Sequence, residues 1–453
     1  MLFGSEVFLL WFLPAILGLY VVCPTSKRNL LLLAASYVFY GWWDMMSLLL
    51  MITATVMNYA AGWGIAVSAA PRTKRFLVFL AIAANVLLLG FFKYEGMLAS
   101  TVNVVAGRNV LPVLNILLPI GISFYIFEGI SYCIDCLHGK VRARSLVEFA
   151  CYLSLFPHVL AGPIIRFHEL AGQLQQRTHS IERVAEGGYR FLLGLFKKVL
   201  IADTMATIAD PLFSNAPSSA FHAWIAVSAY TLQIYFDFSG YSDMAIGLGL
   251  LFGFRFPENF AQPYFSQSIT EFWRRWHMTL SSWFRDYVYI GLGGNRGGSL
   301  ATLRNLFLTM LLAGWWHGAK MTFVVWGSYY GMLLCIERVL QPSRVLERLP
   351  AALRHLLTLF LVMMGWVLFR SSSFPDALAF YRALFSGALP WSAPDPWMLG
   401  ALVAAALFVL AEARIPLRPR FSGPLGIGSA LAFVICLIVI FGDHASPFIY
   451  FQF

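Results

Sequence analysis

The sequence predicts an all-α polytopic membrane protein, and two observations carry this prediction. Hydrophobic residues make up 59% of the 453 residues and charged residues only 12%, whereas soluble domains are about half apolar and about a quarter charged. The apolar residues are also gathered into long blocks. Because a helix needs about 20 mostly apolar residues to cross a bilayer, we expect roughly ten to twelve transmembrane helices, with re-entrant or interfacial helices between them.

The apolar blocks mark the candidate helices, although some are too short or too interrupted to cross. They lie near residues 5–23, 29–43, 47–68, 76–92, 112–134, 147–162, 190–208, 222–252, 302–316, 321–340, 352–369, 398–412 and 425–441. Simple hydrophobic hairpins occupy residues 1–110, a core with charges and helix breakers occupies 111–370, and C-terminal helices occupy 371–453. Because no stretch is long enough to be a linker, we interpret 1–453 as a single integral membrane domain.

Basic residues fall in alternate loops, which predicts the orientation of the chain. They form groups at Lys27–Arg28, Arg72–Arg75 and Lys140–Arg144. Because Lys and Arg favour cytoplasmic loops, we predict that these loops are cytoplasmic and that Met1 lies on the opposite, periplasmic side. The basic loops that set the orientation of the chain then account for the formal charge of +10, and nucleic-acid binding is not needed to explain it. The first apolar run has no basic start and no small-residue cleavage site, so we interpret it as a span and not as a signal peptide.

Two cysteines form the pattern that most resembles a metal site. Cys133 and Cys136 are spaced as C-x-x-C, and His138 follows them. A structural zinc site needs four ligands, usually with a second cysteine pair, and no second pair has the required spacing. We therefore expect buried thiols here and no metal site.

Polar residues interrupt the first half of the core, where an ionisable group marks either function or a buried structural joint. Glu128 follows a proline and a glycine, and we favour a kinked helix with a hydrogen-bonded glutamate. His158 and Arg166 flank a Gly-Pro pair and either line a cavity or end a span. Asp237 and Asp243 lie with two serines and a glycine in an apolar run. This predicts a broken helix beside water, in which the two carboxylates hold the break or orient a polar partner.

Residues 269–290 carry aromatic side chains at three- and four-residue steps, which predicts one amphipathic helix at an interface or at the rim of a funnel. Trp273 lies on the apolar stripe, and Arg274 and Arg275 lie off it. His277 falls at the edge of the stripe and is either an interfacial side chain or a functional group. The glycine-rich stretch 291–298 matches no nucleotide-binding motif, and its Arg296 is a candidate contact for an anionic group.

His317 is the residue that the sequence singles out most clearly. It ends an apolar run next to Trp316, and the nearest downstream charge is Lys320. A lone histidine in apolar sequence is often a satisfied core residue, but an ionisable group inside a membrane is a functional candidate by default. Burial favours neutral imidazole, which can take a proton from a hydroxyl group. We therefore predict that His317 acts as a base.

Several stretches resemble the membrane-bound O-acyltransferase family, and specifically its bacterial branch that acetylates exopolysaccharides such as alginate or cellulose. They are Glu258–Phe260, Gln262–Tyr264, Ser268–His277, Leu292–Gly297 and Trp316–Ala319. The resemblance runs from about Phe3 to about residue 370. It implies helices around a central tunnel, with His317 as the family's near-invariant histidine and His277 as its second, less constant polar position.

The resemblance also implies a chemistry. Acetyl-coenzyme A would be a co-substrate that approaches from the cytoplasm, no cofactor would be bound permanently, and the acetyl group would leave on the outer side of a bacterial inner membrane. The implied partners, besides membrane lipid, are periplasmic or membrane-anchored acetyltransferases of the SGNH type, with an exopolysaccharide as final acceptor. The further residues expected to line the tunnel or contact substrate are Asp237, Asp243, Asn259, Trp273, Arg274, Arg275, Trp316 and Arg296.

Different functions stay open at this point. Broken helices with intramembrane carboxylates also suit a transporter or an export channel, although no matching pair of broken segments appears in two halves of the chain. The sequence is also compatible with a non-catalytic scaffold of an export complex and with D-alanyl transfer to a cell-wall polymer. It contains no G-x-S-x-G elbow and no Walker motif, so serine hydrolysis and ATP-driven transport lose support.

Overall fold

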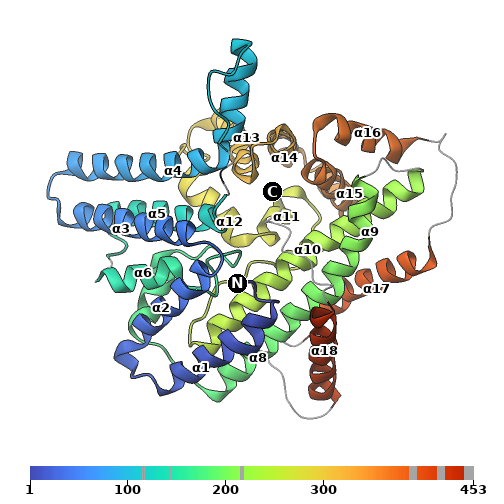
Figure 1. Cartoon of the computed structure of the whole chain (residues 1–453). Coiled ribbons are helices and arrows are strands. Elements are labelled where there is room, and N and C mark those ends of the chain that lie inside the picture. Colours follow the sequence, from blue (N-terminus) through green and yellow to red (C-terminus); the bar gives the residue numbers. More distant parts are fainter. Residues whose placement is uncertain are drawn as a thin grey trace.

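The computed structural model describes residues 1–114, 116, 118–142, 145–214, 219–386, 395–415 and 424–442. Within these ranges every regular element is helical, which confirms the predicted all-α class. Arg144, one of the basic residues that predict the orientation, lies outside the described residues. Figure 1 shows that the long helix α10 runs through the middle of the molecule, with the N-terminal helices on one side and the C-terminal helices on the other.

The helices before the middle of the chain are α1 (Leu13–Val22), α2 (Arg28–Gly41), α3 (Met45–Val67), α4 (Pro71–Ala106), α5 (Ile122–Leu137), α6 (Leu146–Ser154), α7 (Phe167–Gln175), α8 (Ile181–Phe196) and α9 (Asp203–Ser214). Those that follow are α10 (Ala220–Leu251), α11 (Ile269–Arg275), α12 (Met278–Trp283), α13 (Gly298–His317), α14 (Met321–Leu340), α15 (Ala351–Arg370), α16 (Phe374–Phe385), α17 (Pro396–Glu412) and α18 (Pro424–Phe441). Three π-helical turns adjoin them, at Val7–Phe12, Lys197–Ala202 and Phe284–Tyr289. Short 3-10 turns lie at Thr25–Lys27, Pro263–Phe265, Gln341–Ser343 and Leu346–Arg348.

Four helical segments among the described residues are long and apolar enough to cross a bilayer by themselves. They are Met45–Val67, Pro71–Ala106, Met321–Ser343 and Ala351–Arg370. They support a multi-pass membrane protein. The total of ten to twelve crossings and the treatment of the chain as one domain stay predictions.

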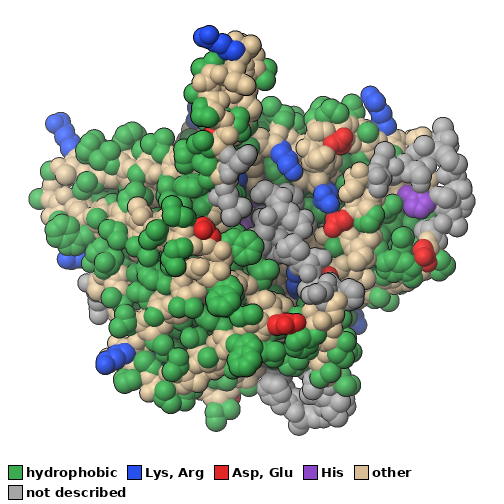
Figure 2. All heavy atoms as spheres, in the orientation of Figure 1, with side chains coloured by type: hydrophobic (Ala, Val, Ile, Leu, Met, Phe, Trp, Pro, Cys, Tyr) green, Lys and Arg blue, Asp and Glu red, His purple; other side chains and the backbone are tan. Residues whose placement is uncertain are grey.

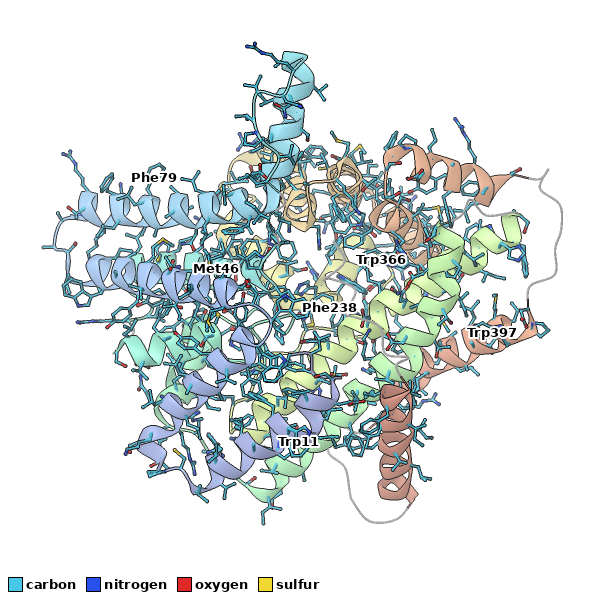
Figure 3. The ribbon with its side chains drawn as sticks, in the orientation of Figure 1. Trp11, Met46, Phe79, Phe238, Trp366 and Trp397 are labelled. Atoms are coloured by element: carbon cyan, nitrogen blue, oxygen red, sulfur yellow. The ribbon has the colours of Figure 1, made fainter. Side chains whose placement is uncertain are left out.

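The outer surface of the helices is rich in large apolar side chains. Trp11, Phe79 and Trp397 are 74%, 66% and 46% exposed, whereas Phe238 and Trp366 are buried. Figure 3 places Phe79 and Trp397 at the periphery and Phe238 and Trp366 near the middle, and hydrophobic side chains dominate the face drawn in Figure 2. Soluble monomers rarely expose apolar surface of this extent, so it fits contact with lipid.

Several helix boundaries differ from the predicted ones. The helix predicted near 112–134 begins only at Ile122, the one predicted near 147–162 ends at Ser154, and α4 extends well beyond the predicted 76–92. Gly121 explains the first difference, because it has φ +77° and a Cβ there would lie 2.4 Å from the carbonyl oxygen of Val159. The turn before α5 therefore packs directly on the irregular segment 155–166, and a helix through this point is excluded.

The predicted break in the helix around residues 235–243 is wrong, because α10 is continuous from Ala220 to Leu251. Its two carboxylates are matched by cations of α8 and of the π-helical turn after it. Asp243 lies 2.8 Å from Arg190 and 2.6 Å from Lys197, and Asp237 lies 2.9 Å from Lys198. Buried acids that are paired with buried cations need no water-filled break. These contacts therefore support a structural role for Asp237 and Asp243.

Glycines allow α8 and α10 to approach closely enough for these ion pairs. A Cβ on Gly194 would lie 2.4 Å from the carbonyl oxygen of Gly240, and one on Gly187 would lie 2.7 Å from that of Gly247. Small residues at such spacing let helix backbones touch within a membrane. The close packing of α8 and α10 thus brings their charged side chains within ion-pair distance, and the sequence pattern does not reveal this contact.

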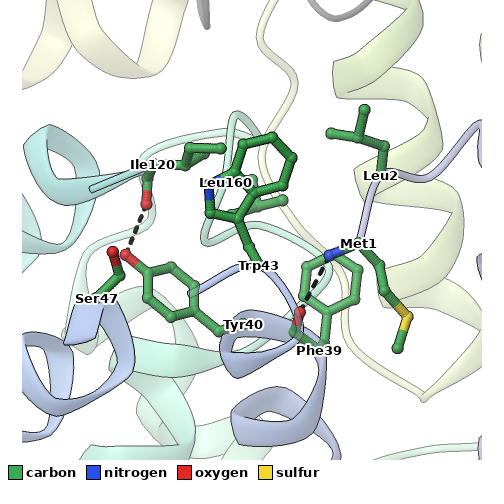
Figure 4. Close-up of a pocket in the computed structure, with 8 residues that line it drawn as sticks. All are labelled: Met1, Leu2, Phe39, Tyr40, Trp43, Ser47, Ile120 and Leu160. Atoms are coloured by element: carbon green, nitrogen blue, oxygen red, sulfur yellow. Dashed lines mark hydrogen bonds between the residues drawn. The ribbon is translucent and has the colours of Figure 1, made fainter. Parts of the chain in front are cut away.

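The N-terminal segment packs against α2 and the turn before α5 (Figure 4). The amino group of Met1 donates to the carbonyl oxygen of Phe39 at 3.2 Å, and the Tyr40 hydroxyl donates to that of Ile120 at 2.6 Å. The pocket that these residues enclose holds about 10 Å³, which is about the space of one water molecule. It is too small to be a substrate site.

Candidate active site

The helix predicted over residues 269–290 is interrupted at His277, so the prediction of one continuous helix is wrong. α11 ends at Arg275 and α12 begins at Met278. His277 between them has φ +41° and ψ +55°, a left-handed conformation that costs a non-glycine residue about 1–3 kcal/mol. The aromatic stripe does not reveal the break, because two short helices in line can bury the same side chains as one long helix. His277 is 1% exposed.

Segment 259–261 holds this break by backbone hydrogen bonds on both sides of it. The amide of Met278 donates to the carbonyl oxygen of Asn259 at 2.9 Å, and the amide of Ala261 donates to that of Arg275 at 3.0 Å. The Asn259 side chain reaches the ring as well, with Oδ1 3.0 Å from Nδ1 of His277. The ring of His277 also meets the ring of Phe238 edge to face, with centroids 4.5 Å apart. Both the backbone and the ring of His277 are therefore fixed.

His317 is placed by the contact between α13 and α14. A Cβ on Gly314 would lie 2.4 Å from the carbonyl oxygen of Phe323, and one on Gly327 would lie 2.5 Å from that of Met310, so these helices touch one turn before His317. The His317 ring packs edge to face against Trp326 and Phe369, with centroids 5.1 Å and 4.9 Å apart. It is 8% exposed, in agreement with the burial that the sequence predicts.

Lys93 of α4 is a residue near this site that the sequence analysis missed. Its ammonium group donates to the carbonyl oxygen of Trp316 at the end of α13 and lies 5.3 Å from the centre of the Trp316 ring. A cation at a helix C-terminus satisfies carbonyl groups that have no partner within the helix. The available signal was that Lys93 is a lone cation in an apolar run, which marks function or a structural joint in a membrane.

A cavity of about 840 Å³ extends from His317 along α13 and α14. Its lining follows α13 from Thr302 to His317, a rise of about 22 Å at 1.5 Å per residue, and α14 from Trp326 to beyond Leu340. Because α13 and α14 are antiparallel neighbours, His317 and Trp326 lie at one end and the C-terminal end of α14 lies at the other. Trp273 and Met278, which flank His277, also line the cavity. Trp273 packs edge to face on Trp326, and Trp326 packs edge to face on His317, with centroids 5.6 Å and 5.1 Å apart.

The end of the cavity away from His317 is rich in charge. The charged residues of the whole lining are Arg274, Arg285, Arg338, Arg344, Arg354, Glu271, Glu337 and Glu347. Glu337 is occupied by α11, because its carboxylate accepts the backbone amides of Ile269 and Thr270. Within the described part of the chain, Arg274, Arg338 and Arg354 belong to no ion pair. The cavity thus combines an aromatic end at His317 with an opposite end of net positive charge.

The lining also contains buried hydrogen-bond donors. The indole N–H groups of Trp273 and Trp326 have no hydrogen-bond partner among the described residues, and both tryptophans line the cavity. Most buried N–H groups in proteins are satisfied. Donors of this kind can stabilise negative charge that develops on a bound substrate.

The structure brings only some of the predicted site residues to the cavity. His317, Trp273 and Arg274 line it, whereas His277 does not, although the next residue, Met278, does. Arg275 pairs with Glu271 at 2.6 Å. The others lie outside the lining: Asp237 and Asp243 in the ion pairs of α10, Asn259 under His277, Trp316 stacked on Phe127 at 5.2 Å, and Arg296 exposed on the turn before α13.

The remaining polar residues of the core have structural partners. Nδ1 of His158 lies 3.2 Å from the Glu128 carboxylate, and both side chains are buried. Arg166 pairs with Asp286 at 2.8 Å. None of these lines the cavity, so the structural interpretation of Glu128 is supported and segment 155–166 is a joint between helices.

The cysteines of the C-x-x-C pattern form no disulfide bond and, among the described residues, belong to no metal site. Cys133 and Cys136 are buried free thiols, and the Cys133 sulfur lies 3.6 Å from Oδ1 of Asn58. No group of three or more metal-binding side chains lies together among the described residues.

Comparisons with known proteins agree with the resemblance seen in the motifs. The model of the membrane-bound O-acyltransferase family matches residues 32–372. The protein named probable alginate O-acetylase AlgI of Pseudomonas syringae pv. tomato is 51% identical over 393 residues, which are 85% of this chain and 75% of that protein. The protein of the same name from Pseudomonas putida is 43% identical over 495 aligned residues that cover both chains completely. The peptidoglycan O-acetyltransferase of Helicobacter pylori is 35% identical and covers 85% of this chain and 80% of its own.

Proposed function

This chain belongs to the membrane-bound O-acyltransferase family, and on that premise we propose that it passes acetyl groups from acetyl-coenzyme A across the membrane for O-acetylation of an exported polysaccharide. That it is a membrane O-acyltransferase follows from the family and from its relatives. The observation that carries the finer proposal is the long cavity, with His317 at its aromatic end and arginines towards the other.

The shape and charge of the cavity support acetyl-coenzyme A as the donor. This molecule has a long, narrow arm that ends in the thioester and an anionic phosphate-bearing part at the other end. Arg338 and Arg354 offer positive charge to the phosphates. The loop between α14 and α15 is basic, which favours a cytoplasmic position for this end of the cavity. The donor therefore enters from the cytoplasm and presents its thioester to His317.

In the proposed reaction His317 takes the proton of the acceptor's hydroxyl group. The hydroxyl oxygen forms an ester bond with the acetyl carbon, and the carbon–sulfur bond breaks with its electron pair on sulfur. The proton then passes from the imidazolium to the thiolate, so that the products are an acetyl ester and free coenzyme A. The indole N–H groups of Trp273 and Trp326 are the candidates to hold the negative charge on the carbonyl oxygen.

The aromatic end of the cavity supports transfer over hydrolysis. Trp326, Phe369 and Phe323 surround the His317 ring, with centroids 4.9–6.2 Å from it. A wall of this kind keeps bulk water from the thioester, which water would otherwise hydrolyse. The hydroxyl of the acceptor then competes with little water for the acetyl group.

The acceptor side of the proposal follows from the relatives. We propose that the chain lies in a bacterial inner membrane with a periplasmic N-terminus. Acetyl groups leave on the periplasmic side, with partner acetyltransferases of the SGNH type completing the transfer to alginate, cellulose or a similar polymer. Relatives named for O-acetylation at 35% identity or more favour acetyl transfer over D-alanyl transfer, over transport and over a purely scaffolding role.

Complementation tests the proposed function. Cells that lack the gene for this chain receive the wild-type chain, His317→Gln or His222→Gln, at matched protein levels, and the acetyl content of the exported polysaccharide is measured by NMR. We expect acetylation with wild type and with His222→Gln, whose position is outside the cavity, and none with His317→Gln. Normal acetylation with His317→Gln would contradict the proposal.

A further inference from the structure

We propose that Asn259 is a positioning residue that holds His277 in a single tautomer, with the proton on Nδ1 and the lone pair on Nε2. His277 then serves the site as a hydrogen-bond acceptor. Its role towards the acyl acceptor rests on the proposed function, whereas the tautomer itself does not depend on it. The inference stands on the hydrogen bonds around Asn259, on the burial of His277 and on its backbone conformation.

The direction of the hydrogen bonds identifies the atom that faces His277. The Thr279 hydroxyl accepts the backbone amide of Ile164 at 3.0 Å, so its own proton is directed elsewhere, and it lies 2.9 Å from Oδ1 of Asn259. The backbone amide of Thr279, which can only donate, also points to this atom at 3.4 Å. The atom is therefore the amide oxygen and not the nitrogen.

The same oxygen lies 3.0 Å from Nδ1 of His277. An amide oxygen can only accept, so Nδ1 must carry the proton. The other end of the amide is engaged as well, because Nδ2 of Asn259 donates to the Ser242 hydroxyl at 3.0 Å. Because both Oδ1 and Nδ2 are hydrogen-bonded, the amide cannot rotate by about 180° without losing these bonds.

Nε2 of His277 is then left as an acceptor. It is buried and has no hydrogen-bond partner within the described part of the chain. A buried polar atom without a partner costs about 1–3 kcal/mol, and a ligand that donates a hydrogen bond removes this cost. In its neutral form Nε2 has no proton to give to the carbonyl oxygen of a thioester. The group that suits it is the hydroxyl-bearing acceptor.

Asn259 also holds the backbone that aims the ring. Its carbonyl oxygen accepts the amide of Met278, the residue directly after the left-handed His277. One residue thus fixes the strained backbone, the ring position and the tautomer. In the proposed reaction His317 takes the proton of the reacting hydroxyl, while His277 accepts a hydrogen bond that orients the acceptor molecule.

Nitrogen NMR of the full chain in lipid nanodiscs, with ¹⁵N-labelled histidine, measures the tautomer directly. His277→Gln identifies the His277 signal among the nine histidines. We expect a proton on Nδ1 in the wild type and in Asn259→Asp, which keeps an acceptor oxygen, and a mixture of tautomers in Asn259→Leu. A wild-type signal with the proton on Nε2, or an unchanged signal in Asn259→Leu, would overturn the inference.

Kinetics test whether Asn259 acts through His277. With release of free thiol from acetyl-coenzyme A as the assay, Asn259→Leu should lower kcat about 10–100-fold and leave the Kd of coenzyme A within about twofold. Asn259→Asp should restore most of this loss. In a His277→Gln background Asn259→Leu should cause no further loss, because the two changes remove the same interaction. A full further loss in that background would contradict the positioning role.

Asn85→Leu is the matched control. Asn85 is a buried asparagine paired with Asn58 at 2.8 and 3.1 Å, away from the cavity lining. It should lower the Tm without changing kcat or the His277 signal. A wild-type chain with the expected tautomer but no thiol release would count against the proposed function and not against the tautomer assignment, so the two failures are distinguishable.

Discussion

Gly314 of α13 and Gly327 of α14 are in backbone contact, since a Cβ added to Gly314 would lie 2.8 Å from Cα of Gly327. His317 follows Gly314 by one helical turn. Neither helix can move away from the other without moving the His317 ring relative to Trp326, against which it packs. The position of the predicted base therefore depends on an interface of two glycines.

Gly314→Ala should separate these helices and impair the enzyme. The added methyl group meets backbone atoms that cannot rotate away, so we expect a destabilisation of about 1–3 kcal/mol and a loss of most of the acetyl transfer. Thermal unfolding in nanodiscs and thiol release measure the two effects. Gly90→Ala is the control, because nothing lies within 4 Å of a Cβ there. Equal behaviour of the two variants would show that the contact does not position His317.

Lys93→Met should lower kcat by about tenfold or more. The change removes a hydrogen bond from a cation to the carbonyl group at the end of α13, and such bonds contribute about 1.5–3 kcal/mol. Without it the last turn of α13, which carries Trp316 and His317, is held less firmly. Lys74→Met, in the first turns of the same helix, should keep wild-type kcat. An unchanged kcat in Lys93→Met would mean that this cation does not support the site.

Arg354→Gln and Arg338→Gln should raise the KM of acetyl-coenzyme A about tenfold while kcat stays near the wild-type value. Both arginines line the cavity, and a charged hydrogen bond to a phosphate is lost in each. The KM of the wild type should also rise with salt, because ions screen exposed charges. Arg296→Gln is the control, since Arg296 is exposed outside the lining. If Arg296→Gln raised the KM equally, the donor would enter by another route.

Glu412→Gln should destabilise the chain by about 3–5 kcal/mol, because it removes one of the two acids that neutralise the buried Lys197. Glu412 also accepts the Tyr235 hydroxyl at 2.7 Å, so α17 should detach from α10 first, which limited proteolysis detects. The control is Glu347→Gln at the exposed pair with Arg344, at 3.8 Å, where we expect about 0–1 kcal/mol. Equal Tm values for the two variants would argue against the anchoring role of Glu412.

The sequence could predict what depends on local pattern. Blocks of apolar residues identify most helices, and an isolated ionisable group such as His317 stands out against them. A charged group in hydrocarbon costs free energy whichever residues surround it, so such a group can be recognised from the sequence alone. The burial of His317 and its place beside a cavity agree with this reasoning.

What the sequence could not predict depends on pairing between distant segments. Asp243 suggests a broken helix only while its partners Arg190 and Lys197 are unknown, and these lie 53 and 46 positions away. The break at His277 is held by Asn259, 18 positions upstream, and leaves the aromatic periodicity intact. Lys93 reaches Trp316 across 223 positions. Such contacts are set by helix packing, so composition and periodicity do not contain them.

The most direct test of the account uses the purified full chain in nanodiscs with acetyl-coenzyme A and a thiol-reactive dye, in the presence of the SGNH-type acetyltransferase of the same pathway and an oligosaccharide of mannuronate. Transfer to the oligosaccharide is followed with ¹⁴C-labelled acetyl groups. The account predicts thiol release and labelled ester with wild type and His222→Gln, and a rate at least about 100-fold lower with His317→Gln, although that variant still binds coenzyme A. Wild-type rates with His317→Gln, at equal protein and equal Kd, would contradict it.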